Sequence, residues 1–256
     1  MRVVCLNAWG GKQFKPLAKY VRELAPHTDI FCFQEIFSSA HETSKNGEYQ
    51  FDLLAQLSAL LADFHPVYSP MLSAAALSGG FGTTSGNAIF VRKRIPLAAQ
   101  GDFFAFGKMY EYKYLKPQEV GFVNYVRVMH DGKPLTVCNV HGIALWPKLD
   151  SPARLEQSAR ILDFVARESN PCIVCGDFNL DPNSQSIAML QNRMRDLVKE
   201  SGVQTTRSEL HYEAFGRGPE VDAISDYLFV TANVPVRAFE VPDVAVSDHL
   251  PLVLDL

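Results

Sequence analysis

The sequence lacks an excess of positive charge: 24 Lys and Arg residues stand against 28 Asp and Glu residues, which gives a formal net charge of −4. Proteins that coat nucleic acid or an anionic membrane through bulk charge have a strongly basic balance or a basic stripe. The composition therefore excludes that mode of binding, and no broad track for duplex DNA is expected. A small local patch with a bound metal can still hold a few phosphates.

Long apolar runs are also missing. No stretch of about 18 apolar residues occurs, and the sequence begins with a strand-like run instead of a basic and then apolar leader. Hydrophobic residues make up 47% and charged residues 20%, values typical of a folded domain and too apolar for a disordered chain. We expect a cytoplasmic protein without a transmembrane segment.

Cysteine is scarce and odd in number, with five in the chain. All lie in apolar, strand-like runs, which favours reduced, buried thiols. Cys172 and Cys175 have C-x-x-C spacing, but residues three apart in a strand face opposite sides. No second cysteine pair completes a zinc site. The spacing therefore argues against a thiol oxidoreductase or a metal site at this pair.

No linker, low-complexity tract or long charge run divides the chain, so residues 1–256 are expected to form a single domain. Hydrophobic periodicity and turn signals predict strands and helices in both halves. Strands are predicted at 2–6, 29–34, 87–93, 120–129, 135–140, 171–176, 227–230, 234–239 and 250–256. Helices are predicted at 14–24 and 51–61, after Ser151-Pro152 and after Ser184. Residues 69–86 read as a loop, residues from about 201 to 220 form a polar, Gly-containing stretch, and the aromatics of 103–114 show no clean period. This order predicts two packed sheets with helices outside.

Polar side chains recur where the predicted strands begin or end. They are Asn7, Glu35, His141, Asp177, Asn179, Asp226, Asp248 and His249. Carboxylates at the ends of buried strands are costly unless they are paired or bind a cation, and open sheets commonly place their sites at strand ends. Oxygen and imidazole groups without a thiolate suit a hard cation such as Mg²⁺.

Five strings, in this order, carry a resemblance to a known family: QEIF, HGIALW, GDFNLDPNS, SDYLFV and SDHLPL. Together they resemble the endonuclease/exonuclease/phosphatase superfamily of deoxyribonuclease I-like, metal-dependent phosphoesterases, over essentially the whole chain. The resemblance implies an α/β (α+β) fold. It would be a four-layer α/β/β/α sandwich, in which helices flank two packed mixed β-sheets.

The resemblance also implies a metal site. Glu35 would be the main ligand of Mg²⁺, with Mn²⁺ as a possible substitute. Asn7 would ligate the metal or orient its shell through the amide oxygen. Asp248 would complete the shell or contribute to a second metal site.

The remaining implied roles are catalytic. Asp177, helped by Asn179, would orient and deprotonate the attacking water. His249 would contact the phosphate and stabilise its developing charge, with Asp226 fixing the tautomer. His141 would contact the phosphate or help the leaving oxygen depart. These roles agree with what in-line attack on phosphorus needs.

The predicted function is therefore Mg²⁺-dependent hydrolysis of a phosphodiester or phosphomonoester by a monomeric enzyme. The substrate would be a small molecule, a lipid headgroup or a nucleic acid. One alternative is a nuclease acting on DNA or RNA within the same superfamily, and another is a catalytically silent binding module that keeps the fold. Ile36 and Phe37 follow Glu35, where abasic-site endonucleases have Thr and Lys, so a DNA-repair enzyme is disfavoured.

Several polar and aromatic residues stay outside the predicted site. Asp222 also precedes a strand, but Asp226 fits the family pattern better. Trp9, Trp146 and the aromatics of 103–114 either flank the site or fill the core. The other histidines are expected to be structural or exposed: His27, His41, His65, His130 and His211.

Overall fold

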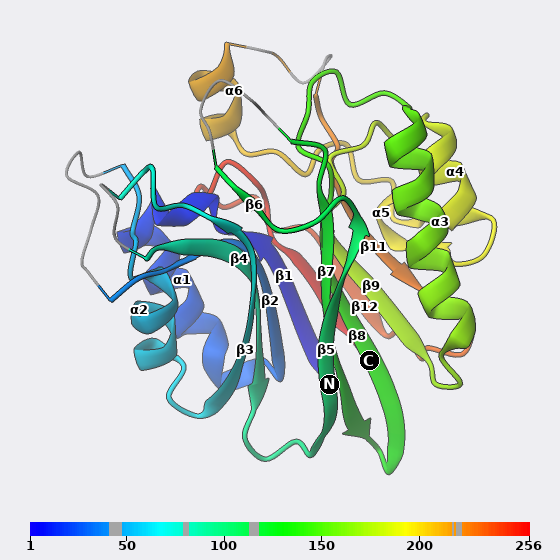
Figure 1. Cartoon of the computed structure of the whole chain (residues 1–256). Coiled ribbons are helices and arrows are strands. Elements are labelled where there is room, and N and C mark those ends of the chain that lie inside the picture. Colours follow the sequence, from blue (N-terminus) through cyan, green and yellow to red (C-terminus); the bar gives the residue numbers. More distant parts are fainter. Residues whose placement is uncertain (41–47, 79–81, 113–117, 217, 219–221) are drawn as a thin grey trace.

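A computed structural model describes residues 1–40, 48–78, 82–112, 118–216, 218 and 222–256. Two mixed β-sheets pack face to face, and helices cover their outer faces (Figure 1). The predicted four-layer architecture is confirmed. His41 lies outside the described residues, so its expected role is not addressed by the structure.

Seven strands form the first sheet and six form the second. The first has the order β12 (Ala238–Glu240), β13 (Leu252–Asp255), β1 (Arg2–Asn7), β2 (Ile30–Ser38), β4 (Thr84–Arg92), β3 (Phe64–Ser73) and β6 (Tyr110–Glu111). The second has the order β10 (Arg195–Asp196), β11 (Asp226–Val230), β9 (Cys172–Asp177), β8 (Lys133–His141), β7 (Gly121–His130) and β5 (Leu97–Phe106). The two chain ends meet, because Leu256 N donates to Met1 O at 2.8 Å.

Apolar faces hold the four layers together. Buried aliphatic side chains of both sheets, such as Ile89 and Val137, form the central core. α1 (Phe14–Leu24) and α2 (Leu53–Leu60) pack on the first sheet through residues such as Leu17 and Leu57. α3 (Pro152–Arg167) and α4 (Gln185–Gln191) pack on the second sheet through residues such as Ile161 and Ile187. None of the described helices is long and apolar enough to cross a membrane.

The predicted caps and turns form as the sequence indicates. The Ser151 hydroxyl accepts a hydrogen bond from Arg154 N at 3.2 Å, and Pro152 opens α3, where its missing N–H costs nothing. Ser184 caps α4 in the same way. Asp131 and Gly132 join β7 to β8 with φ of 48° and 75°, as a tight hairpin requires.

Two of the predictions from local composition were wrong. Residues 69–86 are not all loop, because β3 runs to Ser73 and β4 begins at Thr84. Pro66 and Pro70 made β3 hard to predict, and β3 tolerates them because only its last residues pair with β6. The strand predicted at 234–239 is confined to β12. The polar stretch 201–220, for which no element was predicted, contains α6 (Glu209–Phe215).

The topology brings distant strand ends to one edge of the molecule. β1 runs parallel to β2, and β8 runs parallel to β9, with His141 opposite Asp177. β11 is antiparallel to β9, so its first residue, Asp226, also lies opposite Asp177. Parallel strands place their carboxyl ends together, so one edge gathers polar residues from both sheets.

Buried amides underlie this edge between the two sheets. Asn139 Nδ2 on β8 donates to Phe33 O on β2 at 3.0 Å, and Asn87 Nδ2 on β4 donates to Asn139 O at 3.0 Å. Gln34 Nε2 also contacts Asn139 Oδ1. These bonds satisfy most of the amide groups away from water and fix the sheets relative to each other beneath the polar edge.

Candidate active site

Asp177, the last residue of β9, is surrounded by hydrogen-bond donors. Its Oδ1 accepts from Asn179 N at 2.9 Å and from the Ser225 hydroxyl at 2.6 Å. Its Oδ2 accepts from Asn7 Nδ2 at 3.2 Å and from Asn179 Nδ2 at 3.1 Å. The carboxylate is therefore fixed in orientation by residues of β1, of the segment after β9 and of the segment before β11.

The electrostatic surroundings keep Asp177 ionised. Burial alone would raise the pKa of this carboxyl, but the positive charges of His249, Arg207 and Lys148 lower its pKa well below the usual range. Asp177 can consequently accept a hydrogen bond from water at any physiological pH.

Glu35 faces the same space from the first sheet. It was predicted to end a strand, but β2 continues to Ser38 and Glu35 lies at a bulge, where the pairing with β4 shifts register. A bulge turns a side chain out of the regular alternation. Glu35 Oε1 accepts from Asn7 Nδ2 at 3.1 Å and lies 3.8 Å from His141 Nε2.

His141, the last residue of β8, is buried without a hydrogen-bond partner in the described part of the chain. Its side chain is only 6% exposed, yet neither ring nitrogen makes a hydrogen bond to the described residues. Buried polar atoms without partners are rare in native proteins. The ring can therefore still donate to, or accept from, a bound ligand.

The donor set at Asn7, Glu35 and Asp177 fits a hard divalent cation. The carboxylates of Glu35 and Asp177, which belong to different sheets, lie 3.1 and 3.2 Å from Nδ2 of Asn7. Oxygen ligands of this kind are those that Mg²⁺ and Mn²⁺ take in proteins. Asp177, Asp226 and His249 also present possible ligand atoms within 4.8 Å of one another. Within this second group, however, His249 Nδ1 is already hydrogen-bonded to Asp226.

His249 and Asp226 form a buried carboxylate–imidazole pair. His249 Nδ1 lies 2.9 and 2.8 Å from the two oxygens of Asp226. The Thr206 hydroxyl donates to Asp226 Oδ2 at 2.9 Å, which holds the carboxylate still. This arrangement protonates Nδ1 and turns Nε2 toward Asp177, whose Oδ2 lies 3.6 Å away.

Opposing effects act on the pKa of His249. Burial and the charge of Arg207 lower it, but the carboxylates of Asp226, Asp248 and Asp177 outweigh them, so the pKa is raised. The imidazole is thus biased toward its positively charged form, which suits contact with an anion.

Asp248 joins the site through His249. Its Oδ1 lies 3.8 Å from His249 Nε2, and its Oδ2 lies 3.6 Å from His211 Nδ1 and 3.9 Å from Arg207 Nη1. All of the residues predicted for the site are therefore brought into one connected cluster. Within it, the side chain of Asp248 lies among nitrogen groups, whereas Glu35 and Asp177 both accept from Asn7 Nδ2.

Sequence reasoning missed a second group of charged residues at the site. Asp222 accepts from Lys148 Nζ at 3.0 Å and contacts His211 Nε2 at 3.1 Å. Arg207 Nη1 contacts His249 Nε2. His211 had been expected to be structural or exposed, but it lies buried between Asp222 and Asp248. No spacing signature marks these residues, because they come from loops and from the short helix α6.

Backbone strain is concentrated at this edge. Outside the hairpin, the non-glycine residues with positive φ in the described chain are Trp9 (49°), Glu35 (56°) and Asn179 (54°). Such residues mark ligand sites more often than ordinary structure. Gly176 has φ of 145°, and a Cβ there would lie 2.0 Å from Val140 O. The glycine of the GDFN string is therefore required for β9 to approach β8.

The aromatic residues divide between the core and the edge of the site. Phe103 stacks on Phe164 with ring centroids 5.0 Å apart, and Phe104 packs on Phe122 at 4.9 Å, so both are partly buried against the core. Trp9 N donates to Asn7 Oδ1 at 3.0 Å, which places Trp9 beside the site. Trp146 is half-exposed.

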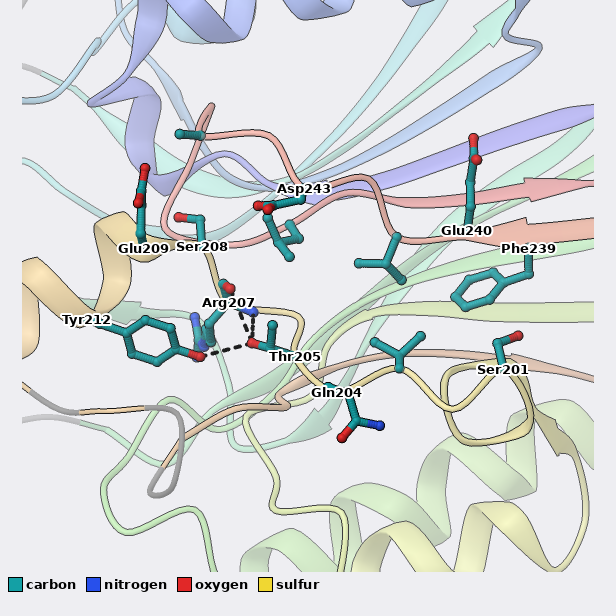
Figure 2. A pocket seen from close by; sticks show the side chains of 14 residues that line it. Ser201, Gln204, Thr205, Arg207, Ser208, Glu209, Tyr212, Phe239, Glu240 and Asp243 are labelled. Carbon is teal, nitrogen blue, oxygen red and sulfur yellow. Dashed lines mark hydrogen bonds between the residues drawn. The ribbon is translucent and has the colours of Figure 1, made fainter.

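A groove of about 750 Å³ lies next to the segment that carries Arg207. Figure 2 shows Thr205, Arg207 and Tyr212 along one part of it, with the Thr205 hydroxyl 2.9 Å from the Tyr212 hydroxyl. Arg207 N donates to Thr205 Oγ1 at 2.9 Å. These bonds fix the backbone from which the Arg207 side chain reaches His249.

The comparisons with known proteins identify the family. Residues 4–249 match the model of the Endonuclease/Exonuclease/phosphatase family, so the chain belongs to this family. Its members are hydrolases that act on phosphoester bonds, and the predicted family resemblance is confirmed. No curated protein shows significant similarity to the sequence.

Solved structures share the fold at low sequence identity. An endonuclease/exonuclease/phosphatase family protein from Leptotrichia buccalis C-1013-b superposes with a TM-score of 0.73 at 16% identity, covering 100% of this chain and 99% of that one. A mannosyl-6-phosphatase from Bacteroides thetaiotaomicron VPI-5482 gives 0.68 at 17%, with coverage of 100% and 98%. The human Nocturnin catalytic domain, with a bound sulfate anion, gives 0.69 at 18%, with coverage of 99% and 92%.

Proposed function

We propose that this protein is a Mg²⁺-dependent phosphoesterase whose site is the polar edge around Asp177. The observation that carries the proposal is the hydrogen bonding of Asn7 to both Glu35 and Asp177, within reach of His249 and His141. The cluster offers oxygen ligands to a cation and imidazole groups to an anion. Metal-assisted hydrolysis of a phosphate ester needs both.

The metal would be held by Glu35 and Asn7, with Asp248 as a further candidate ligand. When bound, the cation neutralises charge on the phosphoryl oxygens and makes phosphorus easier to attack. Mn²⁺ has the same preference for oxygen ligands and is expected to substitute for Mg²⁺.

Asp177 orients the attacking water. Its two oxygens are fixed by Asn7, Asn179 and Ser225, so a water bonded to the carboxylate has a defined direction. The low pKa of Asp177 means that it holds the water throughout the physiological range and takes the proton only as the new P–O bond forms. The ester P–O bond breaks on the opposite side, and the leaving alcohol oxygen takes its proton from solvent water.

His249 and His141 face the phosphate in this scheme. Asp226 holds the proton on Nδ1 of His249 and leaves Nε2 to contact a phosphoryl oxygen, where a positive imidazole stabilises developing charge. His141, whose ring nitrogens make no hydrogen bond to the described residues, contacts the phosphate or the leaving oxygen. None of these groups is missing, which argues against a catalytically silent binding module.

A phosphoester panel tests the proposal. The purified protein is assayed with Mg²⁺ or Mn²⁺ on 4-nitrophenyl phosphate, bis(4-nitrophenyl) phosphate, plasmid DNA, RNA, sphingomyelin and inositol phosphates. We expect turnover of at least one class, abolished by a chelator and restored by added Mg²⁺. Activity confined to nucleic acid would favour the nuclease alternative. Turnover that a chelator leaves unchanged would contradict the proposed metal dependence.

A further inference from the structure

Arg207 is a buried guanidinium without a carboxylate partner at hydrogen-bonding distance in the described part of the chain. Its side chain is 4% exposed, and its nearest carboxylate oxygens, on Asp222 and Asp248, lie 3.8 and 3.9 Å away. Arg207 Nε is buried and has no hydrogen-bond partner among the described residues. Its Nη1 contacts the ring of His249.

Other arginines of the same molecule show what a structural pair looks like. Arg2 donates two hydrogen bonds to the Asp255 carboxylate, at 2.9 and 2.7 Å, and Arg127 donates two to the Glu168 carboxylate, at 2.9 and 2.5 Å. Such forked pairs use the guanidinium fully. Among the described residues Arg207 makes no such pair although it is more deeply buried, so its Nε is left for a ligand.

Lys148 places a second cation next to Arg207. Its side chain is 12% exposed, and its Nζ bonds to Asp222 at 3.0 Å. Burial and the charge of Arg207 lower the pKa of Lys148 even with Asp222 present, so a further anion would stabilise the ammonium group. The position is rigid, because Arg154 Nη1 donates to the carbonyls on either side of Lys148, at 2.5 and 2.6 Å.

The donors around Asp177 outnumber what a phosphodiester can accept. They include Arg207, Lys148 and His249 near Asp222 and Asp248, and His141 beside Glu35, in addition to the proposed metal. A phosphodiester has two unesterified oxygens and one negative charge. A phosphomonoester has three such oxygens and a charge of about −1.5 to −2 at pH 7, and guanidinium is well suited to bind two of them together.

We propose that Arg207 and Lys148 form an anion subsite that selects a phosphomonoester dianion as the substrate, an inference that rests on the proposed phosphoester hydrolysis. Both residues contact oxygens of the phosphate that is attacked. Asp222 and His211 hold the two cations in place when no phosphate is bound. A purely structural role for the network is the competing explanation.

Two substrates with the same leaving group separate these explanations. The ratio of kcat/KM for 4-nitrophenyl phosphate to that for bis(4-nitrophenyl) phosphate is measured in wild type, Arg207→Gln and Lys148→Met. We expect wild type to favour the monoester. Each substitution should lower monoester kcat/KM by about 100-fold and reduce the ratio at least tenfold. Arg195→Gln, which removes an exposed arginine paired with Glu200, is the matched control and should leave the ratio unchanged.

A binding measurement on Lys148→Met tests the subsite even if Arg207→Gln folds poorly. Calorimetric titration with inorganic phosphate in the presence of Mg²⁺ should show at least tenfold weaker binding to Lys148→Met than to wild type, with dimethyl phosphate bound weakly by both. The subsite is disproved if wild type prefers the diester, or if both variants change the ratio less than tenfold. Hydrolysis of both substrates with an unchanged ratio would disprove only the subsite. If wild type hydrolyses no phosphoester, the proposed function fails as well.

Discussion

The side-chain amide of Asn7 donates to Asp177 Oδ2 at 3.2 Å, although 170 residues separate them in the sequence. Asn7 ends β1 in the first sheet, and Asp177 ends β9 in the second. The bond therefore joins the two sheets at the edge where the polar residues gather. It also brings Glu35, the other acceptor of the same amide, to the side of Asp177.

Replacing this amide tests the proposed metal site. Asn7→Leu keeps a similar volume but removes both the donor that positions the carboxylates and the oxygen offered to a cation. We expect Mg²⁺ affinity to fall by about 10- to 100-fold, measured by calorimetric titration. Asn233→Leu, at an exposed turn, serves as the control. Unchanged Mg²⁺ affinity in Asn7→Leu would exclude Asn7 from the metal shell.

Asp226→Asn tests the imidazole pair. The amide can donate as well as accept, so it no longer enforces a proton on Nδ1 of His249. We expect kcat to fall by about 100-fold or more, while the variant stays folded. The measurement is kcat at saturating substrate together with urea unfolding. A kcat within a factor of three of wild type would mean that Asp226 is only structural.

Acid should destabilise the protein through Asp222. Burial alone would raise the pKa of Asp222, but His211, Lys148 and Arg207 lower it well below its ordinary value. Because the folded-state pKa is the lower one, the stabilisation is complete above the unfolded-state pKa of about 3.9 and is lost as pH falls below it.

The check is urea unfolding of wild type and Asp222→Asn at pH 7, 4 and 3. The variant should be less stable at pH 7 by about 3 kcal/mol and should lose less stability than wild type between pH 4 and pH 3. Parallel pH dependence in the two proteins would show that Asp222 does not carry this effect.

The cysteines should be unreactive in the folded protein. All five are free and buried, and burial raises the pKa of the Cys5 and Cys138 thiols. Titration with a chromogenic disulfide is expected to show no rapid reaction in the native state and five thiols in denaturant. If Cys172 or Cys175 reacted rapidly in the folded protein, this result would instead support a thiol oxidoreductase.

The strand-end residues were predictable because local patterns determine where buried strands stop. Asp177, Asp226 and His249 each adjoin an apolar run, so their positions could be read directly from the sequence. Arg207 and His211 could not be found in this way. They lie in a polar stretch without periodicity, and only the folded chain brings that stretch against Asp248.

Glu35 shows a different limit of the sequence. Its presence in the site was predicted, but the bulge that orients it was not, since nothing in the run IFCFQEIFS distinguishes a bulge from a strand end. β3 was hidden by Pro66 and Pro70, which suggest a loop wherever their strand partners are unknown. Both errors arise because hydrogen bonds between strands depend on residues far away in the sequence.

The most direct test of the central claim is the hydrolysis rate of Asp177→Asn, measured with Mg²⁺ on the best substrate of the panel. The substitution keeps the shape but removes the charge that orients the water. Asp181→Asn, on the loop just after the site, is the matched control. We predict at least about a 1,000-fold loss of kcat in Asp177→Asn and less than a threefold change in Asp181→Asn. Wild-type activity in a folded Asp177→Asn protein would contradict the account.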